Sequence, residues 1–531
     1  MLMPMNGALS VLPSPADFRT MTRAPRRDLL CGLTVAVVAL PLALGFGVTS
    51  GLGAASGLIT AIVAGSLAAL FGGSSRQVSG PTGAMTVVLV PIVHEYGANG
   101  VLTVGLISGV MLLVLAFARA GTAMAYVPAP VIAGFTIGIA CVIGLQQVPS
   151  ALGVPTPAGD QVAVVAARAV EEFDATPHWA ALLLALGSAA LMLAGARWKP
   201  TIPFSLAAVG AATVVAEALH LHVTRLGSLP SSLPAPSLAF LDVSRIPTLL
   251  LPAAAVAALA ALESLLSASV ADAMRPGERH DPGKELFGQG IANLAAPLFG
   301  GVPATGAIAR TAVNVRTGAT SRLAALAHAV ILAGIVAVAA PLVGRIPLAA
   351  LAGVLLATAI RMVETDAVRA MARSTHGDAL VLVLTAAGTL ALDLVRAVLI
   401  GLGVSVLLAL RAATRGTRLT PAELPDAVGT VTYRFDGPLL FAAAHRFRRS
   451  LADVRDVTAV DLRLSGLTAV DATGALALKD AVGELRGRGI EVRITGVDHG
   501  HRKVLESLGV LPVNPNPNRG AIPSAAGVTA P

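Results

Sequence analysis

Two polar side chains lie where an apolar helix is expected and could do chemistry there. Glu263 is the only charged residue between residues 246 and 266, and Ser267 follows it by one helical turn. A carboxylate within a membrane is costly unless it is protonated, paired or lining a polar cavity. Because desolvation favours the neutral acid, Glu263 is predicted to be a proton-coupling group. Ligation of a cation, or burial as a structural neutral acid, stays open as an alternative.

A third polar candidate, Arg310, lies near the start of a short apolar segment, within Ala-Ile-Ala-Arg-Thr. A guanidinium at that place can neutralise an anionic substrate or pair with Glu263. The alternative is a structural charge at the mouth of the protein. No Walker A loop, Ser-His-Asp arrangement or zinc signature is present, so the chain is not expected to be an enzyme or to need a cofactor.

A short motif occurs once in each half of the chain and indicates how these residues are positioned. Gly-Pro-Thr-Gly-Ala-Met at 80–85 matches Pro-Ala-Thr-Gly-Ala-Ile at 303–308, and each motif opens an unusually short apolar segment. Such interrupted segments at corresponding places predict an inverted-repeat transporter with its site near the middle of the membrane. The free N–H groups of each half-helix can hold an anion there. Thr82 and Thr305 are expected to donate hydroxyl groups to the site or to cap the helices.

The composition requires a membrane around these segments. Of the 531 residues, 55% are hydrophobic and 13% charged, and the mean hydropathy is +0.77. Apolar runs of about 20 residues match the thickness of a bilayer and must be helical there. We count about fourteen spans. The polar residues 150–177 are expected to form an external loop.

The distribution of charge predicts how the chain is oriented in the membrane, and neither the charge nor the cysteines indicate a further partner. Arginines cluster before the first span, in the loop 361–373 and after the last span, which predicts that both termini are cytoplasmic in a multi-pass plasma-membrane protein. The net charge of +8 therefore needs no nucleic acid to explain it. Cys31 and Cys141 lie in apolar runs, and the His-containing loop 275–285 is interpreted as a solvated turn, so no metal site is expected.

The chain is predicted to have four parts. Residues 1–27 form a cytoplasmic segment and residues 28–411 the transport domain. Strand-like runs alternate with an amphipathic helix beyond Arg418, which indicates a soluble α/β domain over residues 425–511. Residues 512–531 are rich in Pro, Asn, Gly and Ala and are expected to be disordered.

The sequence resembles the SulP family of anion transporters, which includes the animal solute-carrier anion exchangers. The resemblance is carried by residues 28–41, 79–86, 263–272 and above all 279–310, while Asp436-Gly-Pro-Leu-Leu-Phe-Ala and Asp471-Ala-Thr-Gly resemble a STAS domain. It implies a polytopic α-helical fold with a seven-plus-seven inverted repeat, core and gate domains and a homodimer. Leu42 departs from the family, in which many members have glutamine after the first-span proline.

The resemblance also implies roles for individual residues. Glu263 and Ser267 match the coupling-ion positions, with protons favoured over sodium. Asp471 and Thr473 match a regulatory turn whose hydroxyl is phosphorylated in soluble relatives, although an N-cap on the helix that follows is the favoured interpretation of this turn. The substrate-binding residues implied by the match are Phe46, Thr82, Gly83, Ala84, Thr305, Gly306, Ala307, Ile308, Ala309 and Arg310.

Together these observations favour secondary active transport of a small anion by alternating access. Proton-coupled sulfate uptake is the first hypothesis, with bicarbonate or a fumarate-like dicarboxylate as alternatives. An exchanger or a passive channel of the same family also stays open. A nucleobase carrier and a signalling protein anchored by its spans fit the Arg310 position and the matched half-helices less well.

Overall fold

The computed structural model describes residues 11–122, 127–157, 159, 161–199, 204–275, 279–363, 365–392, 394–415, 418–421, 430–440, 447, 451 and 457–512. Residues 1–10 of the predicted N-terminal segment and 513–531 of the predicted tail lie outside this range. The chain divides into two compact units, residues 1–402 and 403–531, each of which is described by itself.

The first half of the chain contributes seven helical segments. Gly97 has a φ of 70° and separates α4 into two of them, and Gly suits this left-handed conformation because it has no Cβ. The long helices are α2 (Pro25–Thr49), α3 (Ala54–Phe71), α4 (Gly83–Phe117), α5 (Ala129–Gln146), α8 (Trp179–Trp198) and α9 (Phe204–Ala218).

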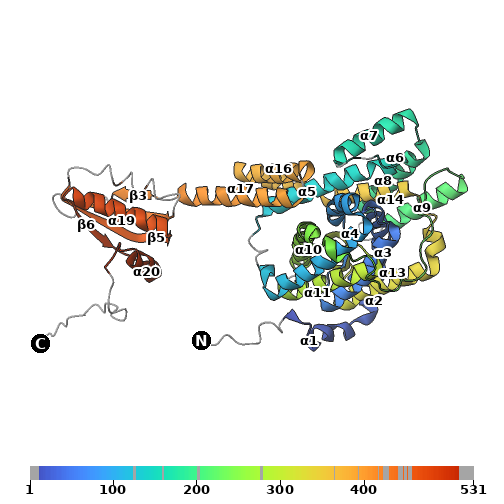
Figure 1. Ribbon diagram of the computed structural model, residues 1–531, viewed down its shortest axis with the longest axis horizontal. Coiled ribbons are helices and arrows are strands. Elements are labelled where there is room, and N and C mark those ends of the chain that lie inside the picture. Colours follow the sequence, from blue (N-terminus) through green and yellow to red (C-terminus); the bar gives the residue numbers. More distant parts are fainter. Residues whose placement is uncertain are drawn as a thin grey trace. The chain divides into compact units, whose positions relative to one another are not determined.

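The second half contributes seven more in the described part of the chain. They are α10 (Ile246–Met274), α11 (Pro282–Ala295), α12 (Ile308–Arg316), α13 (Arg322–Val343), α14 (Leu348–Met362), α16 (His376–Ala391) and α17 (Leu394–Arg415). Smaller elements are α1 (Pro15–Phe18), α6 (Val148–Leu152), α7 (Val162–Ala175), α15 (Thr365–Ser374) and the 3₁₀ turns Arg19–Thr22, Val243–Arg245 and Ala296–Phe299. Their order is shown in Figure 1.

The fourteen segments agree with the predicted seven-plus-seven repeat. In each half the third segment follows a two-residue strand, β1 (Ser79–Gly80) before α4 and β2 (Thr305–Gly306) before α12. By length and composition, seven helices of the described residues can cross a membrane, and α9, α14 and α16 are shorter apolar helices. The predicted fold class is therefore confirmed.

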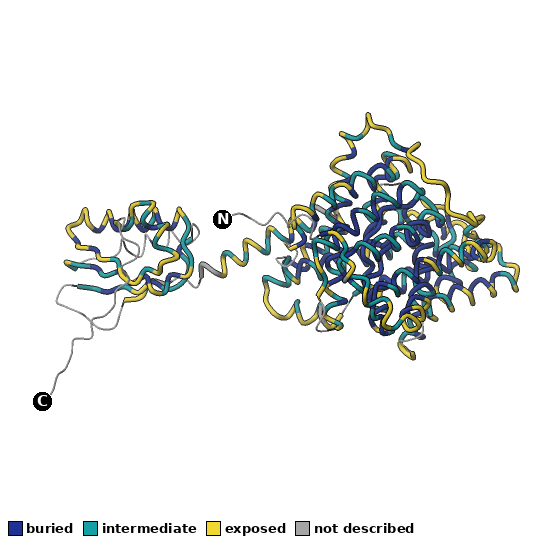
Figure 2. Tube along the Cα trace, turned by 90° about the horizontal axis from the view of Figure 1, so that it is seen from below, coloured by how far each residue is buried: buried dark blue, intermediate teal, exposed yellow. Residues whose placement is uncertain are grey.

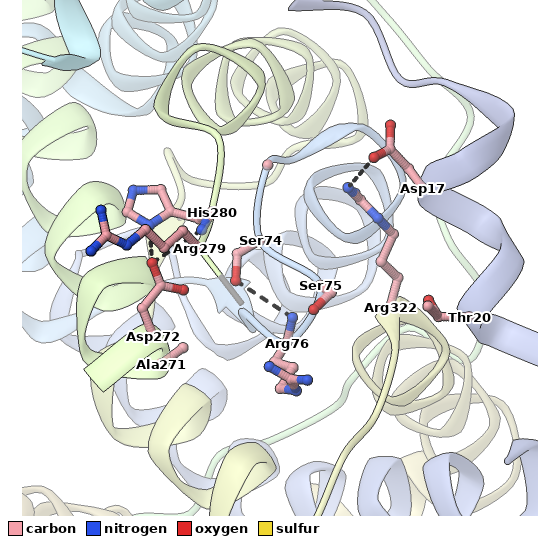
Figure 3. Close-up of a pocket in the computed structure, with 11 residues that line it drawn as sticks. Asp17, Thr20, Ser74, Ser75, Arg76, Ala271, Asp272, Arg279, His280 and Arg322 are labelled. Atoms are coloured by element: carbon pink, nitrogen blue, oxygen red, sulfur yellow. Dashed lines mark hydrogen bonds and ion pairs between the residues drawn. The ribbon is translucent and has the colours of Figure 1, made fainter. Parts of the chain in front are cut away.

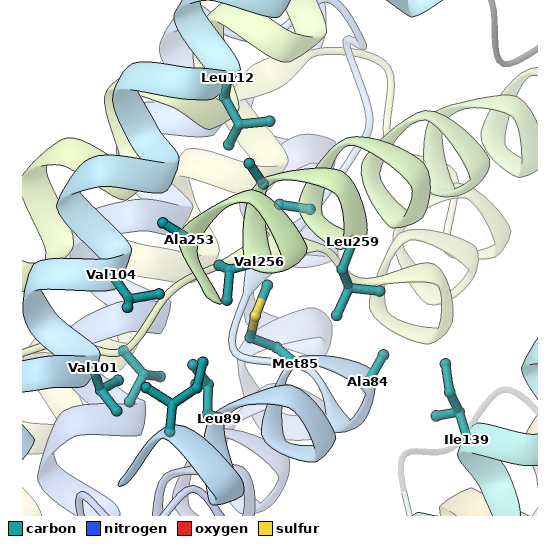
Figure 4. Close-up of a cluster of buried hydrophobic side chains, with 14 of the residues drawn as sticks. Ala84, Met85, Leu89, Val101, Val104, Leu112, Ile139, Ala253, Val256 and Leu259 are labelled. Atoms are coloured by element: carbon teal, nitrogen blue, oxygen red, sulfur yellow. The ribbon is translucent and has the colours of Figure 1, made fainter. Parts of the chain in front are cut away.

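The helices pack in two groups that match the expected core and gate. The core joins α2, α3 and α4 to α10, α11 and α13, and the gate joins α5, α8 and α9 to α14 and α16. Figure 4 shows the apolar contact inside the core, where Met85 and Leu89 of α4 lie beside Val256 and Leu259 of α10. Because lipid tails are as apolar as these side chains, close van der Waals packing between the helices stabilises this contact.

The outer surface of this unit is apolar as well. Buried residues gather in its interior, and exposed residues follow the outer helices (Figure 2). Among the exposed side chains are Leu183 at 66%, Leu251 at 80% and Val338 at 85%. A water-soluble protein does not expose so many large apolar groups together, whereas a lipid-facing surface requires them.

One loop prediction was wrong in part. Residues 150–177 contain the amphipathic helix α7, with Ala166, Ala169 and Phe173 buried along one side. Phe173 packs edge-to-face on Trp179 at 5.3 Å between ring centroids. The many charged residues of this stretch belong to the other side of the helix, which is why the stretch was interpreted as a loop.

The C-terminal unit is an α/β domain. Its sheet has the order β3-β4-β5-β6, made of Arg418–Pro421, Thr430–Leu439, Ala459–Val470 and Glu491–Thr495. β3 is antiparallel to β4, and the other pairs are parallel. α19 (Ala472–Gly487) connects β5 to β6 and α20 (His499–Ser507) follows. The predicted strands at 428–433, 459–464 and 489–495 overlap β4, β5 and β6, although residues 428 and 429 lie outside the described residues and β6 begins only at Glu491. β3 and α20 were not predicted.

Candidate functional site

The two short strands bring the repeated motifs together. β1 and β2 pair antiparallel, with Ser79 opposite Gly306 and Gly80 opposite Thr305. Since each strand leads directly into its helix, α4 and α12 start at neighbouring points and run away from each other. The first four N–H groups of a helix have no intrahelical partner, and the helix dipole is positive at that end. The arrangement therefore concentrates two positive helix ends at one place inside the unit.

The start of α4 packs closely on α5 and on the first span, α2. A Cβ added to Gly83 would lie 2.2 Å from Cδ1 of Ile143 and 3.0 Å from Cε1 of Phe46. No larger residue fits there without a shift, so Gly83 allows the Phe46 ring to lie against the helix start. Thr82 is the N-cap, and its Oγ1 accepts a hydrogen bond from Met85 N at 3.3 Å.

Glu263 connects both motifs. Its Oε2 accepts hydrogen bonds from the hydroxyl of Thr82 at 2.8 Å and from that of Thr305 at 3.0 Å, and the residue is 7% exposed. Thr82 thus acts both as a helix cap and as a donor. Thr305 does not cap α12, because the N-cap of that helix is Ala307 and has no side-chain bond. One carboxylate oxygen therefore receives a hydroxyl from each half of the repeat.

Two serines that follow Glu263 in α10 bind the region in which β2 leads into α12. The Ser264 hydroxyl accepts a hydrogen bond from Gly306 N at 2.9 Å, and the Ser267 hydroxyl donates to Thr311 Oγ1 at 2.9 Å. Thr311 Oγ1 in turn accepts from Val78 N at 3.0 Å. Ser267 shares a face with Glu263 as expected, but its hydrogen bond goes to α12.

Arg310 reaches across from α12 to the other half-helix. It is 1% exposed, and its Nη2 donates to the carbonyl oxygen of Pro81 at 2.8 Å. Its Nη1 has no hydrogen-bond partner. Among the described residues no ion pair within 4.0 Å joins Arg310 to Glu263. The alternative of a direct pair with Glu263 is therefore wrong in this conformation, and the buried cation lies beside the helix starts.

Sequence reasoning missed a polar stripe on α11 that supports the crossing. Glu285, Gln289 and Asn293 are all buried and follow one another at intervals of four residues. The Asn293 side chain donates to Ala304 O and accepts from Ala304 N, at 2.9 and 2.8 Å. Gln289 donates to the Ser79 hydroxyl at 2.7 Å. The four-residue spacing was the signal that could have revealed this face.

The interpretation of residues 275–285 as a solvated turn was wrong at its end. Glu285 is 2% exposed, and its Oε2 accepts from Gly73 N and Ser74 N at 3.0 and 3.1 Å. Its Oε1 accepts from the side-chain amides of Gln77 and Gln289 at 2.8 and 3.0 Å. Four donors compensate a buried carboxylate that sequence spacing alone made look exposed.

In the C-terminal unit, Asp471 is the N-cap of α19. Its Oδ1 accepts from Gly474 N at 2.7 Å, and Thr473 is exposed in the first turn. A capping role for Asp471 therefore follows directly from the geometry. The accessible hydroxyl of Thr473 stays a predicted modification site.

Comparison with known proteins agrees with this architecture. The profile of the sulfate permease family matches residues 26–385, and that of the STAS domain matches residues 422–519. The chain is similar to the putative sulfate transporter YvdB of Bacillus subtilis, with 33% identity over 92% of this chain and 94% of that protein. It is also similar to the bicarbonate transporter BicA of Picosynechococcus sp., with 30% identity over 91% of this chain and 90% of that protein.

Two solved structures show the same fold. The transmembrane domain of a cyanobacterial bicarbonate transporter BicA has a TM-score of 0.64 at 30% identity, covering 73% of this chain and 98% of that one. The overall structure of SLC26A9 has a TM-score of 0.83 at 17% identity, covering 94% of this chain and 89% of that one. The family consists of transporters and not of enzymes. By profile, sequence and fold, the chain belongs to the sulfate permease family and carries a STAS domain at its C-terminal end.

Proposed function

We propose that this protein is a secondary active transporter that takes up sulfate together with protons. The anion lies between the starts of α4 and α12 and contacts Phe46. The backbone there supplies the cradle, from residues 82–84 and 305–309. The single observation that carries the proposal is the Glu263 carboxylate, whose one oxygen accepts hydroxyl hydrogens from both half-helices.

Charge explains how this carboxylate couples proton and anion. An ionised Glu263 repels an anion at the neighbouring helix starts, whereas a protonated Glu263 leaves the helix ends and Arg310 as the local charges. Each ligand therefore favours binding of the other, and this reciprocity is what coupling means thermodynamically. The buried guanidinium of Arg310, held by Pro81 O, contributes positive charge in both states.

Sodium is the less favoured coupling ion. A sodium ion needs several oxygen ligands close together, and the Ser267 hydroxyl lies against Thr311 of α12, with no hydrogen bond to Glu263. Both observed hydrogen bonds to Glu263 come from hydroxyl groups. Protonation of Glu263 requires only that these hydroxyls rotate, whereas a sodium ion would require a new set of ligands around it. We infer proton coupling from this arrangement.

Bicarbonate is the second candidate substrate. The similarity to the BicA transporters supports it, at 30% identity over nine-tenths of both chains. A cradle built largely of backbone and threonine recognises negative charge better than it distinguishes one oxyanion from another. Fumarate-like dicarboxylates, and exchange or channel activity, are alternatives that the transport assay below separates.

The proposal also includes the setting of the transporter. It lies in the plasma membrane with both termini in the cytoplasm, as the arginine clusters favour. It acts as a homodimer in which the core helices move against the gate helices. The STAS domain is regulatory, with Asp471 and Thr473 at the start of α19 as its candidate site.

The decisive experiment compares Glu263→Gln with Glu171→Gln in proteoliposomes. Glu171 is an exposed residue of α7, so its substitution controls for the loss of one carboxylate. Labelled sulfate, bicarbonate and fumarate are each tested with and without an inward proton gradient. We expect Glu263→Gln to keep sulfate counterflow but to lose gradient-driven accumulation, with Glu171→Gln unchanged. Full gradient-driven uptake by Glu263→Gln would refute the assignment.

A further inference from the structure

A polar cavity lies away from the half-helix starts. It has a volume of about 240 Å³, and none of the residues that line it belongs to the transport site proposed above. Its walls come from the N-terminal segment, the α3–β1 loop, the end of α10, the residues before α11 and the start of α13. Figure 3 shows the charged side chains that surround it, which are Asp17, Arg76, Asp272, Arg279, His280 and Arg322.

The acidic groups of the cavity already have partners. The Asp17 carboxylate forms an ion pair with Lys284 at 2.8 Å. The Asp272 carboxylate contacts His280 Nδ1 at 2.7 Å and accepts from the His280 backbone N–H at 3.0 Å. Both contacts reduce the negative charge that these two residues offer to the cavity.

The basic groups exceed them. Arg76, Arg279 and Arg322 line the cavity with three positive charges against two carboxylates, and Lys284 offsets one of those two. The buried carboxylate of Glu285 lies behind the loop, and it already accepts hydrogen bonds from four donors. With His280 neutral, the count over these seven groups is four positive and three negative, so the cavity keeps a net positive charge.

Arg322 is the side chain that most needs a further acceptor. It is 3% exposed, its Nη1 donates to Gly72 O, and its nearest carboxylate, Asp17, is 3.9 Å away. Its Nε is buried without a hydrogen-bond partner. A buried donor without a partner costs about 1–3 kcal/mol. Arg322 lines the cavity, so an oxyanion there would bring a negative charge to a guanidinium whose nearest carboxylate lies beyond hydrogen-bond distance.

We propose that this cavity binds a phosphate-type oxyanion, either free phosphate or the phosphate monoester of a lipid headgroup. Arginines suit this ligand because their planar forks match the oxygens of a phosphate group. Ser74 and Ser75 line the same cavity and add hydroxyl groups. The site is distinct from the transport site, and its binding step does not depend on the proposed transport.

The same loop connects the cavity to the transport site. Ser74 and Arg76 line the cavity, while Ser74 N and the Gln77 side chain donate to Glu285. Gln77 lies so close to Gly306 that an added Cβ there would be 2.1 Å from its Nε2. An anion that fixes this loop would therefore also fix the approach to β1 and β2. The proposed role of this cavity is regulatory. A bound anion would stabilise the pairing of β1 with β2, from which the two half-helices start.

The test is calorimetric titration of the full chain in detergent with inorganic phosphate. The main variant is Arg279→Gln, because Arg279 is exposed and lies outside the helices. Its matched control is Arg373→Gln, an exposed arginine of α15 that does not line the cavity. We expect Arg279→Gln to weaken phosphate binding about fivefold or more, with Arg373→Gln and Glu263→Gln unchanged.

Parallel measurements identify the source of the phosphate group and keep the proposal falsifiable. Nanodiscs containing phosphatidic acid are compared with phosphatidylcholine nanodiscs by the melting temperature of the protein. Binding only from phosphatidic acid that Arg279→Gln weakens supports the lipid headgroup as the source. Phosphate binding that Glu263→Gln abolishes and Arg279→Gln leaves intact places the ion at the transport site and overturns the proposal. No binding from either source also overturns it.

Discussion

Replacement of Gly83 by alanine should block the transport site through a defined collision. The new methyl group would lie 2.2 Å from Cδ1 and 2.9 Å from Cγ1 of Ile143, and 3.0 Å from Cε1 of Phe46. Ordinary contacts begin near 3.4 Å, so the Ile143 side chain or the start of α4 must move. Overpacking of this kind costs about 1–3 kcal/mol, against a gain of up to about 1 kcal/mol from the helix propensity of alanine. The collision should win, because the Phe46 ring leaves no free direction.

The assay measures initial uptake of labelled sulfate and the melting temperature in detergent. Gly83→Ala should lower uptake at least about tenfold, since it displaces the first N–H groups of the half-helix by a large part of an ångström. Gly334→Ala is the matched control, because no atom lies within 4 Å of an added Cβ there. It should leave uptake unchanged and should not lower the melting temperature, since alanine favours the helix there.

A second substitution tests the cause. Ile143→Ala removes both Cγ1 and Cδ1, so the double variant Gly83→Ala, Ile143→Ala should recover at least half of the lost uptake. Residues in contact show coupling energies of about 0.5–3 kcal/mol in such cycles. If Gly83→Ala behaves like Gly334→Ala, or if the two substitutions are simply additive, the packing argument is refuted.

Two further predictions concern the supports of the site. Asn293→Leu should lower the melting temperature markedly, because it leaves the buried N–H and C=O of Ala304 without partners, at about 1–3 kcal/mol for each group; Asn99→Leu, at an exposed residue, is the control and an equal effect of both would contradict this reasoning. Burial alone would raise the pKa of Asp17, but hydrogen bonds from its lysine partner and from Ser14 outweigh it, and the pKa of Asp17 is lowered from 3.8. The stability from this contact is on the order of 1 kcal/mol for a pair whose side chains are 15% and 21% exposed. It is therefore present above pH 4 and is lost as the pH falls through the lowered pKa. Limited proteolysis of the N-terminal segment should be faster in Asp17→Asn than in wild type at pH 7, and the difference should shrink as the pH falls below 4. A difference that does not shrink in acid would show that the ion pair is not the cause.

The fold of the membrane unit follows from the sequence because its constraint is simple. Apolar runs of bilayer length must be helical, and the two Thr-Gly-Ala motifs fix the third segment of each half. The α7 helix escaped prediction because its buried side consists of only a few residues, among them Ala166, Ala169 and Phe173. Local polarity dominates such a stretch, and only tertiary contact shows which side is covered.

The sequence singled out residues that the structure brings together, but it did not indicate their contacts. Glu263, Thr82 and Thr305 were selected from type and place, and the structure joins them through one oxygen atom. Arg310 was recognised too, yet its bond to the Pro81 carbonyl could not be foreseen. This hydrogen bond depends on the antiparallel pairing of β1 with β2. Pro81 and Arg310 are 229 residues apart along the chain, so no local pattern in the sequence indicates that register.

That bond also changes how the charges of the site should be understood. A direct ion pair between Arg310 and Glu263 would satisfy both groups and hold the site neutral whether or not an anion is present. Instead the arginine is bound to a carbonyl and the glutamate to two hydroxyls, so neither charge cancels the other at contact distance. A neutral carbonyl cannot be protonated and keeps Arg310 in place. The hydroxyls can turn when Glu263 gains a proton, because a hydroxyl both donates and accepts. The arrangement therefore leaves one fixed positive charge and one switchable negative charge beside the same two helix starts, which is the combination that proton-coupled anion transport requires.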